Sequence, residues 1–302
     1  MTDKIYHVPT LLKESVNALN INENGIYVDA TFGGGGHSRE ILSRLKNGKL
    51  IAFDRDNDAR RNAGDDNRII FIKNNFRFMH NFLRYYGINK VDGILADLGV
   101  SFHHFDESER GFSFRFPEAP LDMRMGRDAA LNAATVLNTY SRNQLRQMFF
   151  NYGEIKQAER LAGIIVAARE LRPFEIIADL IECISAIAPK SDENKFFAKA
   201  FQAIRIEVNK EMISLKHFLE QTVNVLNKKG RLSIISYHSL EDRMVKNFFK
   251  TGNIEGVQIK DFYGNELSPF VLINKKAIVP DEQEMQNNSR SRSAKLRIAE
   301  KK

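Results

Sequence analysis

The first hundred residues alternate between short apolar runs and amphipathic stretches. The apolar runs are typical of buried strands, and the stretches between them have the apolar spacing of helices with one buried face. The runs expected to form strands are residues 25–31, 48–56, 68–76 and 91–101. The stretches expected to form helices are residues 8–19, 37–45, 57–64 and 78–87. Strands that alternate with helices predict a mostly parallel sheet with helices on both faces.

The alternation stops after the fourth predicted strand. Residues 102–125 are rich in Phe, Arg, Asp and Gly without a clean period, and residues 130–190 have the pattern of helices alone. A long helical pattern, residues 196–226, then leads the chain back to strand-like segments at 228–239, 268–279 and 292–301.

This change of pattern predicts two parts of different architecture. We expect a discontinuous α/β domain made of residues 1–105 and 205–302, interrupted by a helical insertion of residues 106–204. In such an arrangement the chain leaves the sheet after one strand, forms a second structural unit, and then returns to form the remaining strands.

The composition is that of a globular protein, with 43% hydrophobic and 27% charged residues. Cys183 is the only cysteine, which argues against a disulfide framework and a zinc site built from cysteines. No signal peptide and no uncharged apolar stretch of about 20 residues is apparent, so the sequence predicts a cytoplasmic protein without a membrane partner. The net charge of +7 favours a polyanionic partner such as nucleic acid, with a merely basic protein as the alternative.

Four consecutive glycines, Gly33, Gly34, Gly35 and Gly36, separate the first predicted strand from a helix. A glycine-rich turn at this place lets a ligand approach the backbone N–H groups that open the helix. The dinucleotide pattern G-x-G-x-x-G lacks its third glycine, because position 38 is serine, and the lysine of a P-loop is missing. The loop therefore argues against a nucleoside triphosphate, and a tight turn without a ligand is the alternative.

Acidic residues end three of the predicted strands, namely Asp29, Asp54 and Asp97. The carboxyl ends of parallel strands meet at one edge of a sheet, where α/β proteins bind ligands. Asp54 lies where an acid would bind ribose hydroxyls, although a solvent-exposed loop acid is the alternative. Phe76 follows the third strand and suits either a contact with adenine or the hydrophobic core.

Aromatic and basic residues gather in further segments. Phenylalanines alternate with arginines around Phe114 and Arg124, which suits base stacking and phosphate contact as well as a strand with one buried face. Tyr237 and His238 follow a strand at the same predicted edge of the sheet. Arg292 belongs to a basic stretch that suits phosphate contacts or a solvated run of charge.

Several motifs spread over nearly the whole chain resemble one known family. They are HVPTLLKE, DATFGGGGHS, DGILADLGVS, ERGFSFRF followed by PLDMRM, FQAIRIEVNKE, RLSIISYHSLEDR and RSRSAKLRIAE. Together they resemble the bacterial 16S ribosomal RNA (cytosine-N4-)-methyltransferases, the MraW-like family. The resemblance implies a Rossmann-like methyltransferase domain that binds S-adenosylmethionine, and an inserted domain that recognises RNA. It also implies methylation of the exocyclic N4 of one cytosine in the decoding region, with 16S rRNA in the small ribosomal subunit as the partner.

The resemblance further implies which residues contact S-adenosylmethionine. They are Gly35, Gly36, His37, Asp54, Phe76, Asp97 and His104. Asp29, Gly33 and Gly34 are added as cofactor contacts from their position at the strand end and in the glycine loop, although relatives often have a bulkier residue where this chain has Gly34. Asp54 would hold the ribose hydroxyls, Phe76 would lie beside the adenine, and Asp97 would lie at the methyl-donor end. The family usually has glutamine where this chain has His104 and a second serine where it has Phe102, so the contact at position 104 depends on an imidazole replacing an amide.

Methyl transfer to cytosine N4 needs an acceptor for a proton, because the nitrogen lone pair is delocalised into the ring. Asp97 is predicted as this acceptor from its position, with Ser101 assisting and Asp122 as the second candidate. The side chains expected to hold the flipped base or its phosphates are Phe114, Arg124, Tyr237, His238 and Arg292.

Two hypotheses of other classes compete with this one. A non-enzymatic RNA-binding protein on a Rossmann scaffold would not need Asp54 and Asp97, and both are present. A nicotinamide-dependent dehydrogenase would be expected to have the third glycine and a proton-relay motif, and neither is found. No set of metal ligands is predicted, and the sequence makes no prediction of the oligomeric state.

Overall fold

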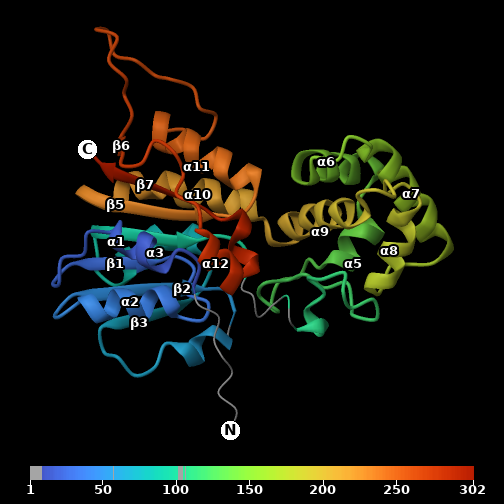
Figure 1. The fold of residues 1–302 in the computed structure, drawn as a ribbon, viewed down its shortest axis with the longest axis horizontal. Coiled ribbons are helices and arrows are strands. Elements are labelled where there is room, and N and C mark those ends of the chain that lie inside the picture. The colour runs from blue at the N-terminus through green and yellow to red at the C-terminus, as the bar shows by residue number, and fades with distance from the viewer. Residues whose placement is uncertain (1–8, 57, 101–104, 106) are drawn as a thin grey trace. The chain divides into compact units, whose positions relative to one another are not determined.

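The computed structural model describes residues 9–56, 58–100, 105 and 107–302. The chain forms two compact units (Figure 1). The first unit consists of Met1–Gly99 and Met212–Lys302, and the second consists of Val100–Glu211. The two units differ in architecture, since the first contains the sheet and the second is helical.

Within the described residues, the first unit contains a seven-stranded sheet with the order β3-β2-β1-β4-β5-β7-β6. Its strands are β1 (Ile26–Asp29), β2 (Lys49–Asp54), β3 (Ile69–Lys73), β4 (Val91–Asp97), β5 (Leu226–Ser236), β6 (Phe270–Leu272) and β7 (Lys295–Lys301). Strands β1 to β5 pair with one another in parallel, and β7 is antiparallel to both β5 and β6. The α/β class with a mostly parallel, Rossmann-like sheet is thus confirmed.

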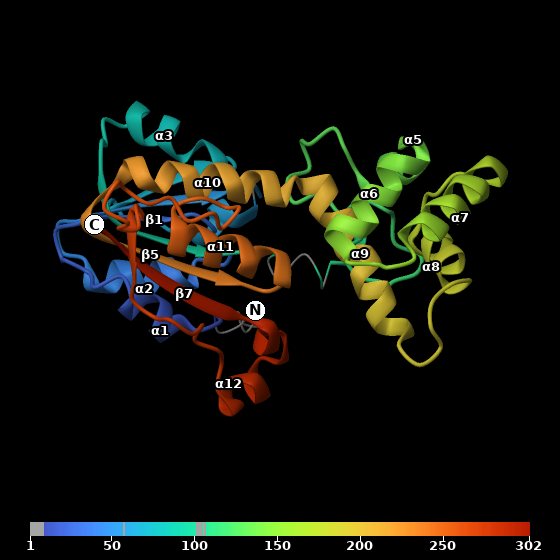
Figure 2. The ribbon, with the colours of Figure 1, turned by 90° about the horizontal axis from the view of Figure 1, so that it is seen from above.

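Helices cover both faces of this sheet (Figure 2). The helices of this part of the chain are α1 (Leu12–Asn17), α2 (Gly36–Arg44), α3 (Met79–Tyr85), α10 (Glu211–Val225), α11 (Ser239–Thr251) and α12 (Glu282–Asn287). Apolar side chains of α3, α10 and α11 pack with one face of the strands, and those of α1 and α2 pack with the other. The segments between β2 and β3, before α3 and before β7 contain the 3-10 helices η1 (Asp58–Asn62), η2 (Phe76–Phe78) and η4 (Ser289–Ser293). The predicted helix 57–64 is therefore a short 3-10 turn.

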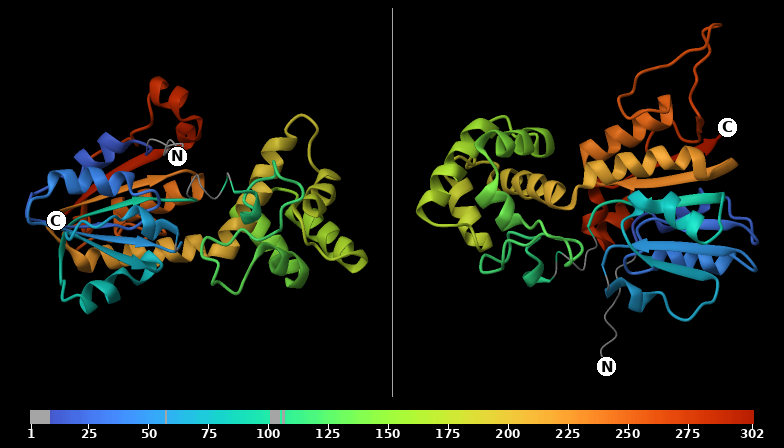
Figure 3. Two further views of the ribbon diagram at one scale, coloured as in Figure 1. Left: turned by 90° about the horizontal axis from the view of Figure 1, so that it is seen from below. Right: turned by 180° about the vertical axis from the view of Figure 1, so that it is seen from behind.

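The second unit is helical within its described residues, as the sequence pattern predicts (Figure 3). It contains η3 (Ser108–Arg110), α5 (Ala133–Thr139), α6 (Arg142–Gly153), α7 (Ala158–Leu171), α8 (Ile177–Ser185) and α9 (Glu193–Asn209). Its hydrophobic core contains Phe149, Phe197 and Phe201. The long helical pattern predicted for 196–226 is interrupted at Lys210, whose φ of 51° ends α9 in the left-handed region. No helix among the described residues is long and apolar enough to cross a membrane.

Candidate active site at the carboxyl edge of the sheet

Three acidic residues occupy the carboxyl edge of the sheet, which is the edge where the parallel strands end. Asp29 is the last residue of β1, Asp54 the last of β2 and Asp97 the last of β4. Strand β1 lies between β2 and β4, so the three carboxyl groups gather at adjacent strand ends. The structure thus brings together the acids that the sequence places at separate strand ends.

The glycine loop is fixed to the neighbouring strand by Asp54. The backbone N–H of Gly33 donates to Asp54 Oδ2 at 2.7 Å, and the N–H of Asp56 donates to Oδ1 at 2.7 Å. Gly33 and Gly35 have φ angles of 51° and 73°, a conformation that glycine adopts without steric cost. Asp54 therefore orders the loop in addition to any contact with a ligand.

Two of the four glycines are required by close packing within the chain itself. A Cβ on Gly36 would lie 2.0 Å from Pro9 Cγ, and a Cβ on Gly35 would lie 2.9 Å from Phe32 Cζ. At Gly33, in contrast, the nearest atom to such a Cβ would be the Thr31 carbonyl oxygen at 4.0 Å. A Cβ at Gly33 would thus have room, in contrast to one at Gly35 or Gly36.

Asp29 links the end of β1 to helix α2. Its Oδ2 accepts a hydrogen bond from the Ser38 hydroxyl at 2.7 Å, and its Oδ1 accepts one from the N–H of Thr31 at 3.0 Å. The side chain is completely buried. Burial raises the pKa of Asp29 to about 6, against the effect of these hydrogen bonds and with a smaller contribution from the charge of Asp54.

Asp97 has the most perturbed carboxyl group of the edge. Its Oδ1 accepts a hydrogen bond from the Tyr237 hydroxyl at 2.8 Å, and its backbone N–H donates to Thr31 Oγ1 at 2.6 Å. Burial raises the pKa of Asp97 to about 7, and repulsion from Asp29, Glu241 and Glu284 adds to the effect of burial, while the Tyr237 hydrogen bond opposes it. Within the described part of the chain, no lysine or arginine forms an ion pair with Asp97.

His37 faces the other oxygen of Asp97. Its Nε2 lies 3.1 Å from the carbonyl oxygen of Thr10, and because a carbonyl only accepts, Nε2 carries the proton. Its Nδ1, which is 3.9 Å from Asp97 Oδ2, therefore presents a lone pair to Asp97. Burial lowers the pKa of His37 to about 4, so the imidazole is neutral and gives Asp97 no positive charge.

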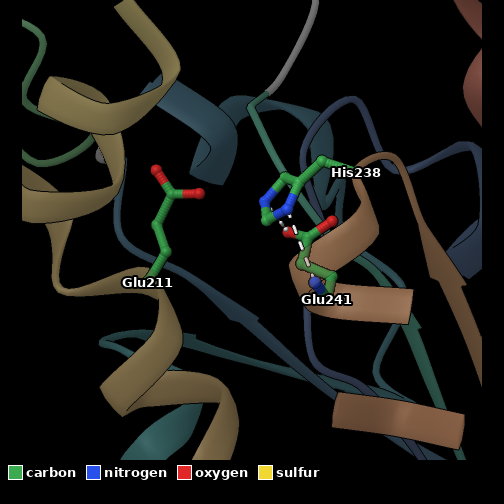
Figure 4. A group of neighbouring side chains, drawn as sticks. All are labelled: Glu211, His238 and Glu241. Atoms are coloured by element: carbon green, nitrogen blue, oxygen red, sulfur yellow. Dashed lines mark hydrogen bonds and ion pairs between the residues drawn. The ribbon is translucent and has the colours of Figure 1, made fainter. Parts of the chain in front are cut away.

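Tyr237 and His238, which the sequence predicts as base contacts, lie just after β5 at the same edge. The Tyr237 hydroxyl donates to Asp97 Oδ1. Burial raises the pKa of Tyr237 well above the usual value, so the hydroxyl keeps its proton and remains a donor. His238 is the N-cap of α11, where its Nδ1 accepts from the N–H of Glu241 at 3.4 Å. Figure 4 shows the imidazole of His238 beside the Glu241 carboxylate, with Nε2 3.2 Å from Oε1.

Glu241 and Thr10 belong to this site although the sequence analysis does not select them. Glu241 is buried and accepts a hydrogen bond from the backbone N–H of Tyr237 through Oε2 at 2.9 Å. An acid three residues after an N-cap is a helix-start signal. The spacing of His238 and Glu241 could therefore have indicated that Glu241 lies in the first turn of α11. Thr10 is fully buried, and no local sequence pattern indicates its contacts.

Phe76 and its neighbours connect the third strand to α10. The Phe76 ring meets the Phe218 ring edge to face with centroids 5.2 Å apart, and Asn75 donates to the Ser214 hydroxyl at 3.0 Å. Phe76 is half-buried, so one side of the ring is packed. Ser101 and His104 lie outside the described residues.

Asp122, the second candidate acceptor, is in the helical unit and is paired with Arg124. The guanidinium donates to Oδ1 at 2.8 Å through Nε and to Oδ2 at 2.7 Å through its second terminal nitrogen. Its remaining terminal nitrogen donates to the carbonyls of Arg127 and Ala129. Burial acts to raise the pKa of Asp122, but the hydrogen bonds and charge of Arg124, together with the charge of Arg110, lower it overall.

The remaining predicted substrate residues have different surroundings. Phe114 is in an irregular segment rather than a strand, and its ring packs edge to face against Phe197 and Phe201 with centroids 5.9 and 5.7 Å apart. Arg292 is exposed in η4. The Phe114 ring is thus part of the apolar packing inside the helical unit, and its role toward a base stays a prediction.

Comparisons with known proteins show which family the sequence resembles. The chain is 58% identical over 298 residues to the ribosomal RNA small subunit methyltransferase H of Bacteroides fragilis strain YCH46, which covers 98% of each chain. It is 56% identical to the protein of the same name from Flavobacterium johnsoniae, again covering 98% of each chain. Among solved structures, an rRNA methylase from Streptococcus thermophilus aligns with a TM-score of 0.42 and 12% identity over 98% of this chain and 99% of that one. The family model described as the MraW methylase family matches residues 4–302, and the chain belongs to this family.

Proposed function

We propose that this protein transfers a methyl group from S-adenosylmethionine to the N4 atom of a cytosine in 16S rRNA of the small ribosomal subunit. Membership of a methylase family and relatives named as ribosomal RNA small subunit methyltransferases support the reaction class and the RNA. The observation that carries the proposal is Asp97, a largely buried carboxyl group at the carboxyl edge with a pKa of about 7.

The carboxyl edge offers groups that fit S-adenosylmethionine. The open space beside Gly33 leaves room for the methionine end, and Asp54, half-buried at the end of β2, is placed to contact ribose hydroxyls. Phe76 presents its unpacked side for adenine. When bound, S-adenosylmethionine supplies an electrophilic methyl group on a sulfonium, so the protein's contribution is positioning and electrostatics.

Asp97 accepts the proton that N4 loses as the new bond forms. A general base works best when its pKa lies near the operating pH, because it is then ionised in a useful fraction and still basic. The pKa of Asp97, about 7, meets this condition. Asp122 does not, since its carboxylate is held by Arg124 and its pKa is lowered.

The helical unit and the basic segment around Arg292 supply the contacts with RNA in this proposal. An exposed arginine suits a phosphate contact, and the net charge of +7 favours an anionic partner. The guanidinium of Arg124 has most of its donors engaged within its own loop, so Arg124 contributes to RNA binding chiefly by ordering that loop. The cytoplasmic location expected from the sequence remains a prediction.

The test is incubation of the protein with labelled S-adenosylmethionine and small ribosomal subunits, followed by nucleoside analysis of the 16S rRNA. We expect label in N4-methylcytidine. Calorimetry with S-adenosylmethionine and NAD side by side separates the competing hypotheses, because a dehydrogenase binds NAD and a non-enzymatic RNA-binding protein binds neither. Label in another nucleoside, or none, would contradict the proposal.

A further inference from the structure

Thr10 makes polar contacts with both side chains that flank Asp97. Its carbonyl oxygen accepts from His37 Nε2 at 3.1 Å, and its hydroxyl lies close enough to the Tyr237 hydroxyl to act on the pKa of Tyr237, which it lowers. Thr10 is completely buried, so water does not replace these contacts. One residue thus determines the surroundings of both oxygens of Asp97.

The direction of the hydrogen bonds through Thr10 follows from Asn288. The N–H of Arg290 donates to Asn288 Oδ1 at 3.2 Å, which leaves the amide nitrogen to donate to Thr10 Oγ1 at 3.5 Å. The Thr10 hydroxyl then has its own proton available for the oxygen of Tyr237, and its lowering effect on the pKa of Tyr237 agrees with a donor at this place. Tyr237 in turn has its single proton directed to Asp97 Oδ1.

The position of Thr10 is itself set by segments far along the chain. The N–H of Leu11 donates to Glu284 Oε1 at 2.8 Å. The Leu11 side chain packs in a buried cluster with Ile235 and Leu296. Leu11 has a φ of 48°, a conformation that is costly for leucine and persists only where the surroundings hold it. These contacts fix the backbone on which Thr10 lies.

We propose that Thr10 is a positioning residue that holds His37 in its Nε2-protonated form and directs the Tyr237 proton onto Asp97, thereby setting the pH at which Asp97 becomes a base. This inference rests on the proposed function. It assigns to Thr10 a role that neither motif spacing nor strand position indicates.

Several charged or titratable groups face Asp97 and enter its titration. They are Asp29 at the end of β1, His37 in α2, Tyr237 after β5, Glu241 in α11 and Glu284 in α12. The acids among them favour the protonated carboxyl, and the Tyr237 hydrogen bond is the contact that favours the ionised form. A change that misdirects the Tyr237 proton therefore moves the titration of Asp97 to higher pH.

The test compares Thr10→Val, which removes the hydroxyl at nearly constant shape, with Thr10→Ser, which keeps it. Turnover is measured on small ribosomal subunits from pH 5.5 to 9, with S-adenosylmethionine binding measured by calorimetry. For Thr10→Val we expect turnover at pH 7 to fall about 3- to 10-fold, which is the value of one hydrogen bond. The midpoint of the rising limb should move up by about 0.5–1 pH unit. Thr10→Ser should keep the original midpoint.

A purely structural role for Thr10 predicts a different result, in which Thr10→Val is less stable and less active at every pH with an unchanged midpoint. That result would overturn the inference, as would equal midpoint shifts in both variants. These outcomes require an active wild-type protein. Wild-type protein without methylation of the subunit would instead overturn the proposed function, so the two failures are distinguishable.

Discussion

Asp97 and Asp122 are both carboxyl groups that the sequence offers as proton acceptors, and their surroundings differ in one respect. Asp122 is held by a guanidinium that donates to both of its oxygens. Asp97 is surrounded by a neutral imidazole, a tyrosine hydroxyl and three other acids. Pairing lowers the pKa of Asp122, whereas burial without a cation raises that of Asp97. Burial raises the pKa of an acid toward neutral pH only where no cation is paired with it, and this is the difference between Asp97 and Asp122.

The largest effect that tests this comparison is on turnover. Asp97→Asn keeps the shape and the Tyr237 contact but removes the base, so we expect turnover to fall by about 10²- to 10⁴-fold. The dissociation constant of S-adenosylmethionine should change only a few-fold. Methylation of small ribosomal subunits and calorimetry provide the two measurements. Full turnover with unchanged binding would show that Asp97 is not the acceptor.

The second effect is on the free energy of unfolding. We expect it to fall when Asp122 is replaced and to rise, near pH 8, when Asp97 is replaced. Asp122→Asn leaves Arg124 partly unpaired, so we expect a loss of roughly 1–3 kcal/mol in the free energy of unfolding. Urea denaturation followed by circular dichroism measures this loss, with Glu118→Gln at an exposed position of the same irregular segment as the control. An Asp122→Asn protein as stable as wild type would mean that the ion pair is not structural.

For Asp97 the expected change depends on pH. Its folded pKa of about 7 lies above that of an unfolded aspartate, so the stability it contributes is present at low pH and is lost as the pH rises from about 4 to 7. His37, with a folded pKa of about 4, acts in the opposite direction up to about pH 6.5. Because His37 is present in both proteins, the difference in unfolding free energy between Asp97→Asn and wild type reports on the Asp97 carboxyl group.

We therefore expect Asp97→Asn to be more stable than wild type at pH 8 while being inactive, by up to about 4 kcal/mol at about 1.4 kcal/mol per unit of raised pKa. The difference in unfolding free energy should grow from pH 4 to 7 and level off above pH 8. Denaturation at several pH values measures it. A variant that is less stable at pH 8 would indicate that Asp97 is stabilised by a cation, contrary to the comparison.

The smallest effect concerns the acids around Asp97. Glu284→Gln keeps an acceptor for the N–H of Leu11 but removes a negative charge that raises the pKa of Asp97. We expect the midpoint of the pH–turnover profile to move down by roughly a few tenths of a unit. Glu282→Gln, on an exposed position of the same helix, should leave the midpoint in place. An upward shift would mean that the Glu284 contact with Leu11 was lost.

Much of the sheet and part of the site could be predicted from local pattern. The parallel strands were expected because each is a short apolar run between amphipathic stretches, and Asp29, Asp54 and Asp97 are at the strand ends where the pattern places them. The pattern overestimates β6, where the predicted segment 268–279 contributes only Phe270–Leu272. An apolar run does not distinguish a strand from a loop with exposed apolar side chains.

Partners distant along the chain could not be predicted in this way. The contact between Thr10 and Tyr237 joins two residues that are far apart along the sequence, and no periodicity of the sequence extends over such a distance. The glycine loop is a similar case, because the reason for Gly36 is its packing against Pro9, outside the loop motif. Arg124 was expected to face a substrate, since its sequence context does not reveal the carbonyls that occupy it.

The contacts of residues 10 and 11 with Glu284 and Asn288 also have a consequence for biosynthesis. Residues 10 and 11 are translated more than 270 residues before Glu284 and Asn288. A nascent chain on the ribosome therefore cannot complete this part of the site until residue 288 has been translated. A premature stop between α11 and α12 would remove Glu284, Asn288 and β7, and it would leave the strand end that carries Asp97 without the contacts that reach it through Thr10.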